Sequence, residues 1–342
     1  MKVGILSGGG DAPGINAVIR AAVRHGIQTY GYEMIGIKDG WNGLLKNRYV
    51  PLNLNVISGI LPRGGSILGT SRTNPFKTQD GPEKTLQNAK RKKIDAVVAI
   101  GGDDTLTVAS KMVDLGLKCV AVPKTIDNDL AETDTTFGFN TAVSIATDAL
   151  DRLHTTAEAH HRIMIIEVMG RYTGWIAIET GIAGGADVIL IPEKPFDTQE
   201  VCEYIRRRQK RGKKFSLIVV AEGCKPKDGK EILHSTNVDE FGHPQLGGVG
   251  YYLGNEIEKT LGIETRVVTL GHLQRGGSPT AYDRVLATRF GKAAIDLINE
   301  EKYGHMVALK GKDITSVPLK TVIGKRKTVD LQLYDLAKIF FG

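Results

Sequence analysis

Short apolar segments alternate along the chain with longer segments that have one apolar face. The longest amphipathic segment, residues 138–156, places Ala142, Ala146 and Leu153 on one face at helical spacing. Strands that alternate with helices are typical of parallel βαβ units, so the pattern predicts an α/β fold. The strands that we predict are residues 2–6, 32–37, 96–100, 119–122, 163–168, 188–191, 216–221 and 266–270.

Helices are predicted between most of these strands. They follow the first strand, begin near residue 105, cover residues 138–156, begin near residues 172 and 198, and cover residues 250–261, 284–299 and, as a short amphipathic helix, 331–341. One long polar connection, residues 223–248, interrupts this order. Long connections in compact domains are usually functional, so we expect a functional or lid role there.

Composition and charge narrow the class of protein. Hydrophobic residues make up 41% and charged residues 24% of the 342 residues, which is ordinary for a globular protein of two domains. The net charge of +7 is compatible with nucleic acid, a membrane surface or an anionic small substrate. The basic runs at residues 90–93 and 206–214 lack interleaved aromatic residues. They are typical of solvated helix ends, so nucleic acid is not the expected partner.

Cysteine usage and hydropathy bear on the compartment. Cys119, Cys202 and Cys224 lack CxxC spacing, which favours neither a disulfide framework nor a zinc site. No stretch approaches the about 18 apolar residues of a membrane span, and the apolar run at the N-terminus is too short for a signal peptide. We therefore expect a cytoplasmic protein with no membrane partner.

Two glycine-rich loops follow early strands. The first, SGGGDAPG, leads into a predicted helix, and backbone amides at such a helix start bind phosphate. A dinucleotide loop is the alternative, but Gly8, Gly10 and Gly14 give GxGxxxG rather than GxGxxG. The second loop, residues 63–76, contains Arg72 and suits either an oxyanion or a plain surface position. The chain has no GxxxxGK(S/T) motif.

Acidic residues follow the ends of two successive strands. Asp103 comes after the strand at 96–100, and Pro123 is expected to end the next strand and to place residues 124–129 in a loop. Phosphoryl transfer needs a carboxylate for the metal and a base near the acceptor hydroxyl. Asp103 is therefore a candidate Mg²⁺ ligand and Asp127 a candidate general base. The alternative for the TIDND segment is that its side chains cap a turn or helix.

Six segments resemble motifs of the phosphofructokinase family, in this order: GGGDAPG, IGGDDT, PKTIDND, EVMGRYTGW, AEG and GHLQRGGSP. They extend over most of the chain, and their combination is far more specific than one glycine motif. The resemblance implies Mg²⁺-dependent phosphoryl transfer to the 1-hydroxyl of fructose 6-phosphate. It implies two Rossmann-like three-layer αβα domains with largely parallel sheets and an active site in the cleft between them. Residues 1–138 with about 275–323 would bind the donor and Mg²⁺, and residues 139–274 with about 324–342 the sugar phosphate.

The resemblance also implies roles for individual residues. Asp127 would take the proton from the 1-hydroxyl, Asp129 would support it, and Arg171 would steady the transition state. Asp103 would hold the metal. Donor contacts would come from Gly10, Arg72, Gly102, Asp104 and Lys124, and the catalytic set would be Asp127, Arg171, Asp104, Lys124 and Thr125. The implied sugar-phosphate ligands are Thr125, Ile126, Asp127, Asp129, Arg162, Met169, Gly170, Arg171, Glu222, Arg266, His272, Leu273, Gln274 and Arg275.

Two of these ligands imply an oligomer. In the family, arginines that match Arg162 and Arg266 reach the 6-phosphate of the neighbouring subunit, so a homodimer or homotetramer is expected. A sugar phosphate is a dianion, and guanidinium groups supply the planar donors that it needs. The site would then be incomplete in a monomer.

Two positions bear on the phosphoryl donor. Asp104 and Lys124 stand where ATP-dependent bacterial members typically have glycine, and the pair resembles the pyrophosphate-dependent branch. A carboxylate at 104 would lie where the α-phosphate of ATP enters. Two charges about 4 Å apart repel by about 4 kcal/mol at an effective dielectric of about 20, which is on the order of a thousandfold. ATP remains the alternative donor, because Asp104 can also point outward as a helix cap and Lys124 also occurs in ATP-using relatives.

Three further expectations complete the sequence-based picture. Trp41 falls in a donor loop, and the sequence leaves open whether it contacts an adenine. A basic effector ring is only partly present, because Leu54, Gly59 and His154 stand where arginine, aspartate and arginine are expected, so we predict weak or absent allosteric control. A non-catalytic sugar-phosphate-binding subunit is a more remote alternative, which would normally have lost the base or the metal ligand.

Overall fold

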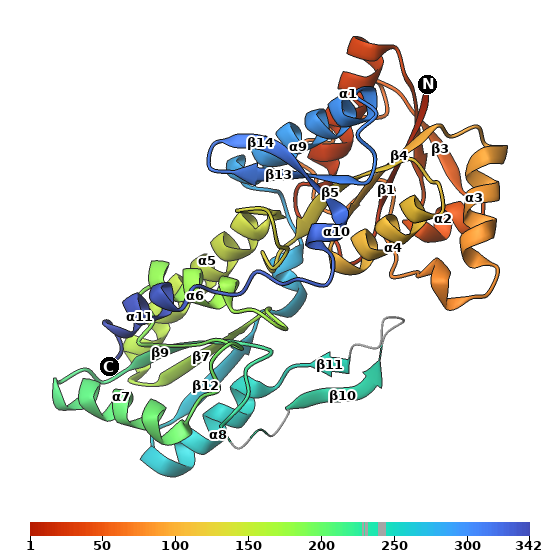
Figure 1. Cartoon of the computed structure of the whole chain (residues 1–342). Helices are drawn as coiled ribbons and strands as arrows, with labels where there is room; N and C mark the ends of the chain where they lie inside the picture. Colours follow the sequence, from red (N-terminus) through yellow and green to blue (C-terminus); the bar gives the residue numbers. More distant parts are fainter. Residues whose placement is uncertain (228, 230–231, 239–243) are drawn as a thin grey trace. The chain divides into compact units, whose positions relative to one another are not determined.

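The chain folds into two compact units. The computed structural model describes residues 1–227, 229, 232–238 and 244–342. Unit 1 contains the described residues within 1–140 and 275–326, and unit 2 those within 141–238, 244–274 and 327–342. Figure 1 labels their helices and strands. None of the helices in the described part of the chain has the length and apolar character needed to cross a membrane.

Unit 1 is built on a mixed sheet with the strand order β14-β13-β5-β4-β1-β2-β3. Its parallel strands are β1 (Lys2–Ser7), β2 (Glu33–Ile37), β4 (Ala96–Gly101), β5 (Cys119–Thr125) and β13 (His305–Lys310). Both edges are antiparallel, formed by β3 (Tyr49–Leu52) and β14 (Asp313–Pro318). β4 is apolar and buried along its whole length, and β1 is buried from Val3 to Ser7, as strands covered on both faces must be.

Helices cover both faces of this sheet (Figure 1). One core forms under α1 (Ile15–Tyr30) and α9 (Ala281–Asn299), with Val18 and Phe290 fully buried in it. The other core contains Trp41 and Leu106 and lies under the remaining helices of the unit. These are α2 (Trp41–Leu45), α3 (Gly81–Arg91), α4 (Asp103–Asp114) and α10 (Leu319–Val322), with the short 3₁₀ helix η1 (Pro75–Lys77) between α2 and α3 in the chain.

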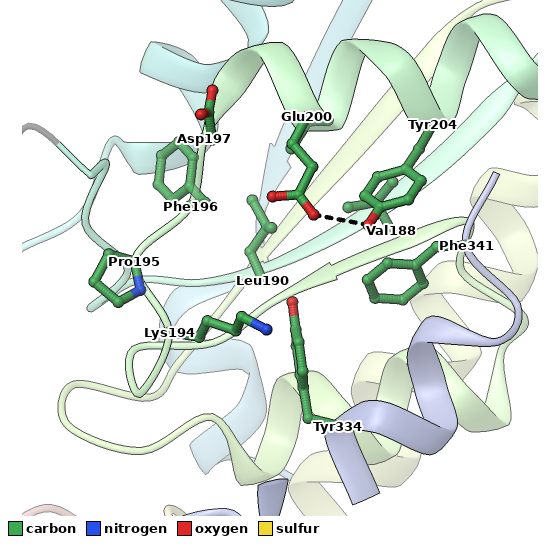
Figure 2. Close-up of a pocket in the computed structure, with 11 residues that line it drawn as sticks. Val188, Leu190, Lys194, Pro195, Phe196, Asp197, Glu200, Tyr204, Tyr334 and Phe341 are labelled. Carbon is green, nitrogen blue, oxygen red and sulfur yellow. Dashed lines mark hydrogen bonds between the residues drawn. The ribbon is translucent and has the colours of Figure 1, made fainter. Parts of the chain in front are cut away.

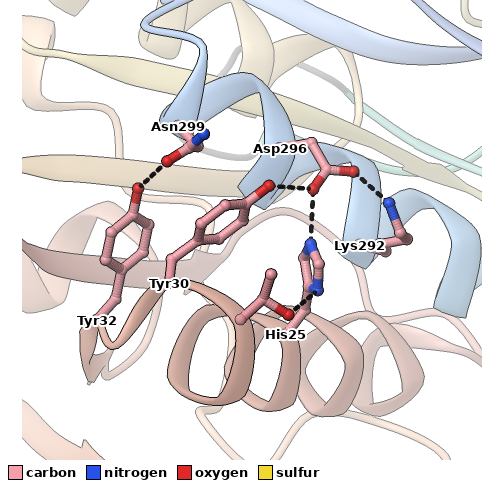
Figure 3. A network of polar contacts seen from close by, with 7 residues as sticks. His25, Tyr30, Tyr32, Lys292, Asp296 and Asn299 are labelled. Carbon is pink, nitrogen blue, oxygen red and sulfur yellow. Dashed lines mark hydrogen bonds and ion pairs between the residues drawn. The ribbon is translucent and has the colours of Figure 1, made fainter.

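A polar network joins the C-terminal half of α1 to the C-terminal half of α9 (Figure 3). The carboxylate of Asp296 accepts hydrogen bonds from the Tyr30 hydroxyl at 3.0 Å and from the Lys292 ammonium at 2.6 Å. His25 Nε2 lies 2.6 Å from the same carboxylate. Because one partly buried acid serves three donors from two helices, it fixes the packing of α1 against α9.

Unit 2 contains a parallel sheet with the order β12-β7-β9-β8. Its strands are β7 (Ile163–Val168), β8 (Val188–Leu190), β9 (Ser216–Ala221) and β12 (Thr265–Thr269). Its helices are α5 (Phe139–His160), which begins in unit 1, α6 (Trp175–Ala183), α7 (Thr198–Lys210), α8 (Val249–Leu261) and α11 (Leu331–Lys338), together with η2 (Gly271–Arg275). Trp175 Nε1 donates to the carbonyl of Lys327 at 2.8 Å, which ties the C-terminal segment to α6.

Two sequence-based expectations need correction. β5 does not end at Pro123, because Pro123 pairs with Gly101 at the end of β4 and the next two residues pair with β6 (Phe137–Gly138). Proline lacks an N–H, but the loss is small where one ladder ends and another begins. Residues 223–248 are not a plain loop, since they contain the antiparallel pair β10 (Leu233–Val238) and β11 (Pro244–Leu246). Their predicted lid role lies partly outside the described residues and stays a prediction.

Candidate active site

The glycine-rich turn after β1 lies against a guanidinium group. Arg275 Nη1 donates to the carbonyl of Asp11 at 3.2 Å. A Cβ atom at Gly10 would lie 2.6 Å from the same nitrogen, so a larger residue would displace the arginine. The sequence resemblance assigned Arg275 to the sugar 6-phosphate, and the structure places its guanidinium beside the glycine-rich turn of unit 1. A turn of backbone amides with an arginine beside it suits a phosphate.

Lys124 brings a second cation to this turn. Its side chain is only 3% exposed, and its ammonium donates to the carbonyl of Gly10. Burial and the nearby Arg275 lower the pKa of Lys124 to about 7, although Asp11 and Asp127 act in the opposite direction. A lysine held in this way changes charge near neutral pH and lies where it can meet a phosphate oxygen.

Two carboxylates lie in the first turn of α4, the helix that follows β4. The helix begins at Asp103, two residues before the predicted start, and its N-cap is Gly102. Asp104 therefore lies inside the first turn and is not the capping residue. The free N–H groups and the dipole of a helix N-terminus favour negative charge at these positions.

Asp103 fits the role of a magnesium ligand. Its Oδ1 is buried and accepts no hydrogen bond from the described residues. A buried carboxylate oxygen without a donor suits a cation, and Mg²⁺ commonly takes one or two carboxylates while substrate phosphates and water complete its shell. Within the described part of the chain, no three His, Cys, Asp or Glu side chains gather to form a complete metal cage.

The TIDND segment after β5 is held in a defined conformation. The Thr125 hydroxyl accepts a hydrogen bond from the backbone N–H of Asp127 at 3.0 Å, and the side chain of Asn128 accepts one from Thr136 at 3.1 Å. Asn128 has a positive φ of 53°, a conformation that asparagine tolerates well. Burial, and then the charges of Asp127 and Asp103, raise the pKa of Asp129. The three aspartates therefore share one electrostatic environment.

Unit 2 presents a second set of predicted residues at the carboxyl ends of its strands. The turn Met169–Arg171 follows β7, and Gly170 has a positive φ of 142° that only glycine adopts readily. The N–H of Glu222 donates to Val168 at 2.9 Å, which places the turn after β9 beside the turn after β7. Gln274 is fully buried, and its side-chain oxygen accepts the N–H of Met169 at 3.3 Å. Gln274 thus orients this turn from within unit 2.

The other predicted ligands differ in exposure. Arg162 and Arg266 both pair with the carboxylate of Glu264, Arg162 at 2.5 Å. His272 and Leu273 are exposed on η2. The Ile126 side chain is fully buried in unit 1, which leaves its main chain for any contact with a ligand. Arg72 is exposed and contributes to lowering the pKa of Lys124.

Two residues with a part in the donor region were missed or left open by the sequence. Cβ atoms at Gly8 and Gly101 would lie 2.7 and 2.3 Å from side-chain atoms of Thr105, so Thr105 fills the space under both turns. Trp41 is 2% exposed, and its Nε1 donates to the carbonyl of Thr105 at 3.3 Å. Its indole belongs to the core beneath α4 and is not available to stack on an adenine. The sequence signal that could have identified Thr105 is the glycine at the end of each of two neighbouring strands, which leaves room for its side chain.

A separate cavity in unit 2 is too small for a sugar phosphate. It lies where α11 packs near α7 and is lined by Lys194, Glu200, Tyr204, Tyr334 and Phe341 (Figure 2). Its volume of about 20 Å³ has room for a water molecule. This cavity therefore offers no room for the substrates of the predicted reaction.

Comparison with known proteins identifies the family of the chain. The sequence profile described as "Phosphofructokinase" matches residues 2–298, which is most of the chain. The chain belongs to the phosphofructokinase family. The solved phosphofructokinase of Pichia pastoris in the T-state is similar to it, with a TM-score of 0.84 and 31% identity over 99% of this chain. The chain spans 38% of the length of that Pichia chain. The predicted resemblance and the predicted two-domain αβα phosphofructokinase fold are confirmed.

Relatives within the phosphofructokinase family are named for both donors. A Streptomyces coelicolor protein described as pyrophosphate–fructose 6-phosphate 1-phosphotransferase is 53% identical over 343 residues, covering 100% of both chains. A second protein of that organism, described as ATP-dependent 6-phosphofructokinase 3, is 50% identical over 329 residues, covering 96% of each chain. Overall similarity therefore does not separate the donors, and residues of the donor region carry that argument.

Proposed function

We propose that this phosphofructokinase transfers a phosphoryl group from pyrophosphate to the 1-hydroxyl of fructose 6-phosphate, giving fructose 1,6-bisphosphate, in a reaction that requires Mg²⁺. The observation that carries the proposal is the Lys124 ammonium, buried at the carbonyl of Gly10 in the glycine-rich turn. The full-length relative at 53% identity that is named for pyrophosphate supports it.

The residues of unit 1 suit the chemical step. Asp127 takes the proton from the 1-hydroxyl, whose oxygen forms the new bond to the terminal phosphorus of the donor. The bond from that phosphorus to the bridging oxygen breaks, and phosphate leaves with the electron pair. Lys124 stabilises the charge that develops on the leaving phosphate. Mg²⁺, held at Asp103, would neutralise oxygens of the donor.

Residues of unit 2 suit the sugar phosphate. Arg171, with the main chain of Met169 and Gly170, would hold the sugar and steady the transferred group, and Glu222 would accept a sugar hydroxyl. The partly exposed Arg162 and the exposed Arg266 retain the assignment to the 6-phosphate of a neighbouring subunit in a homodimer or homotetramer. We also propose that unit 1 binds the donor and unit 2 the sugar. The same proposal includes a cytoplasmic location and weak allosteric control.

ATP is the second candidate donor, because a relative at 50% identity is named for it. Two features of unit 1 favour pyrophosphate. The Asp104 carboxylate lies in the first turn of α4, where it repels an additional phosphate. The Trp41 indole is buried in the core, so it adds no stacking surface for a base.

One assay tests the proposal directly. Purified protein is given fructose 6-phosphate and Mg²⁺ with either pyrophosphate or ATP, and formation of fructose 1,6-bisphosphate is measured. The expected result is a higher kcat/KM with pyrophosphate. Faster turnover with ATP would show that the donor assignment is wrong, and no product with either donor would reject the function. The Asp127→Ser protein is the control for contaminating activity.

A further inference from the structure

Glu167 is a buried carboxylate that the assigned chemistry does not use. It is the penultimate residue of β7, and β7 lies between β12 and β9 in the sheet of unit 2. Its residue is 1% exposed, and it pairs in register with Thr269 and Val220. A buried charge is costly unless hydrogen bonds compensate it, so its partners identify its role.

The partners of this carboxylate are backbone N–H groups at the start of α8. Oε2 accepts the N–H of Gly250 at 2.7 Å, and both carboxylate oxygens lie 3.2 Å from the N–H of Gly248. Gly248 is the N-cap of α8, so Glu167 satisfies donors that have no partner within the helix. Its negative charge is also favourable at this end of the helix dipole.

The contact depends on glycine at position 250. A Cβ atom there would lie 3.2 Å from Glu167 Oε2 and 2.9 Å from Val267 Cγ1. Either approach is tighter than ordinary van der Waals contact, so a side chain would push α8 away from the carboxylate. The sequence thus provides both the acid and the close approach that it needs.

The same strand end also fixes the sugar-binding turns. Directly after Glu167, the carbonyl of Val168 accepts the N–H of Glu222, and the carbonyl of Gly170 accepts the N–H of Gly223 at 3.1 Å. The main-chain carbonyl of Glu167 accepts the N–H of Leu270 at 3.0 Å, which holds the chain just before η2. Three segments that carry predicted sugar-phosphate ligands therefore meet at the end of β7.

We propose that Glu167 is a positioning residue for the sugar-phosphate site, because its carboxylate fixes the start of α8 to the strand end that carries the Met169–Arg171 turn. Glu167 touches no substrate in this role. It acts by keeping that turn and the start of η2 in the geometry that binds the sugar. The kinetic part of this inference rests on the proposed function, whereas the anchoring of α8 does not.

The test compares Glu167→Gln with a matched control in the same sheet. Glutamine keeps the size of the side chain but removes its charge and turns one acceptor into a donor. Asp187→Asn is the control, because Asp187 is also a buried acid that accepts a backbone N–H, from Leu217 at 2.8 Å, but at the amino end of the sheet. Gly250→Ala disturbs the contact from the helix side and serves as a second variant.

Two measurements are made on the full chain. Hydrogen exchange followed by mass spectrometry reports on the N–H groups at residues 248–254, and steady-state kinetics report on fructose 6-phosphate. A hydrogen bond to a charged group contributes enough for about a tenfold change in an equilibrium constant or more. We expect exchange at the start of α8 and KM for fructose 6-phosphate each to rise about tenfold in Glu167→Gln. In Glu167→Gln, KM for pyrophosphate, measured at saturating fructose 6-phosphate, should stay near the parent value. In Asp187→Asn, exchange at residues 248–254 and KM for fructose 6-phosphate should both stay near the parent values.

The outcomes separate the inference from the function. The positioning role would be overturned if Glu167→Gln matched the Asp187→Asn control either in hydrogen exchange at residues 248–254 or in KM for fructose 6-phosphate. A higher KM for pyrophosphate of equal size would also overturn it, because the effect would then be general. If Glu167→Gln does not fold, Gly250→Ala is read by the same criteria. A parent protein without activity would reject the proposed function, and the exchange measurement would still decide whether Glu167 anchors α8.

Discussion

The ammonium group of Lys124 donates a hydrogen bond to the main-chain carbonyl of Gly10, 114 residues earlier in the chain. The bond joins the end of β5 to the glycine-rich turn after β1, two strands that are separated in the sheet by β4. It places a cation with a lowered pKa where backbone amides and Arg275 gather.

Lys124 should make the use of pyrophosphate sensitive to pH. Burial, followed by Arg275, lowers its pKa to about 7, so the fraction of charged ammonium falls as pH rises through that value. kcat/KM for pyrophosphate should therefore fall above about pH 7, approaching about tenfold per pH unit. Lys124→Arg keeps its charge and should lose this fall, because a guanidinium does not titrate there. Equal slopes in both proteins would contradict a role for the Lys124 charge.

Replacing Asp104 and Lys124 together by glycine should shift the donor preference. The change removes a carboxylate that repels the α-phosphate and a cation that binds pyrophosphate. kcat/KM for ATP should rise by at least about tenfold, and kcat/KM for pyrophosphate should fall. Asp114→Gly, at the far end of α4, is the control. It should leave the ratio of kcat/KM for ATP to kcat/KM for pyrophosphate unchanged. If the parent already turns over ATP faster than pyrophosphate, the donor assignment is wrong.

Asp127→Ser should lose most of the activity. Loss of a general base usually lowers the rate by about 10² to 10⁴. Asp134→Ser is a suitable control, because Asp134 is an exposed acid of the same region whose carboxylate accepts the N–H of Gly311 at 2.6 Å. kcat should fall in Asp127→Ser and stay near the parent value in Asp134→Ser. An Asp127→Ser protein with most of its activity would reject Asp127 as the base.

Mixing two inactive proteins should restore activity if Arg162 serves a neighbouring subunit. One variant is Asp127→Ser, and the other carries Arg162→Ala with Arg266→Ala. A mixed oligomer would contain sites with an intact Asp127 from one chain and intact arginines from the other. The two proteins are unfolded together, refolded and assayed against each protein treated alone. Activity that never exceeds the average of the separate samples would show that the arginines act within their own subunit.

Phe290→Ala should destabilise unit 1. Phe290 is fully buried on α9 and meets Phe137 edge to face, with ring centroids 6.5 Å apart. Truncating a buried aromatic residue typically lowers the free energy of unfolding by about 3–5 kcal/mol. Tyr282→Ala on the same helix is the control, because Tyr282 is 47% exposed and its removal leaves no cavity. Denaturant unfolding measures the free energy of unfolding of both variants. A loss in Phe290→Ala no larger than in the control would contradict the packing.

Some features follow from local sequence. β7 and β9 have the predicted bounds because each is a short, mostly apolar run rich in isoleucine and valine. The basic runs occur where we expected solvated helix ends, in the last turns of α3 and α7. Lysine and arginine are favourable there because they complement the helix dipole. Such signals need no knowledge of distant residues.

Other features depend on contacts that the sequence does not display. The strands β13 and β14 were missed, since the turn KGKD that joins them is charged and the place of β13 in the sheet depends on its pairing with β5. Lys124 stays in β5 beyond Pro123 because Phe137 of β6, thirteen residues later, supplies a new partner. The motifs predicted Arg275 as a ligand, but its contact with Gly10 joins residues 265 positions apart in the chain, which local sequence does not display.

The two tryptophans of the chain fall one in each unit, Trp41 beneath α4 and Trp175 at the start of α6. A buried indole and a half-buried one emit at different wavelengths and change differently when their surroundings unfold. Replacing either by phenylalanine would leave a fluorescent reporter confined to one unit. The protein thus carries its own optical probes for asking whether the two units melt together or in sequence.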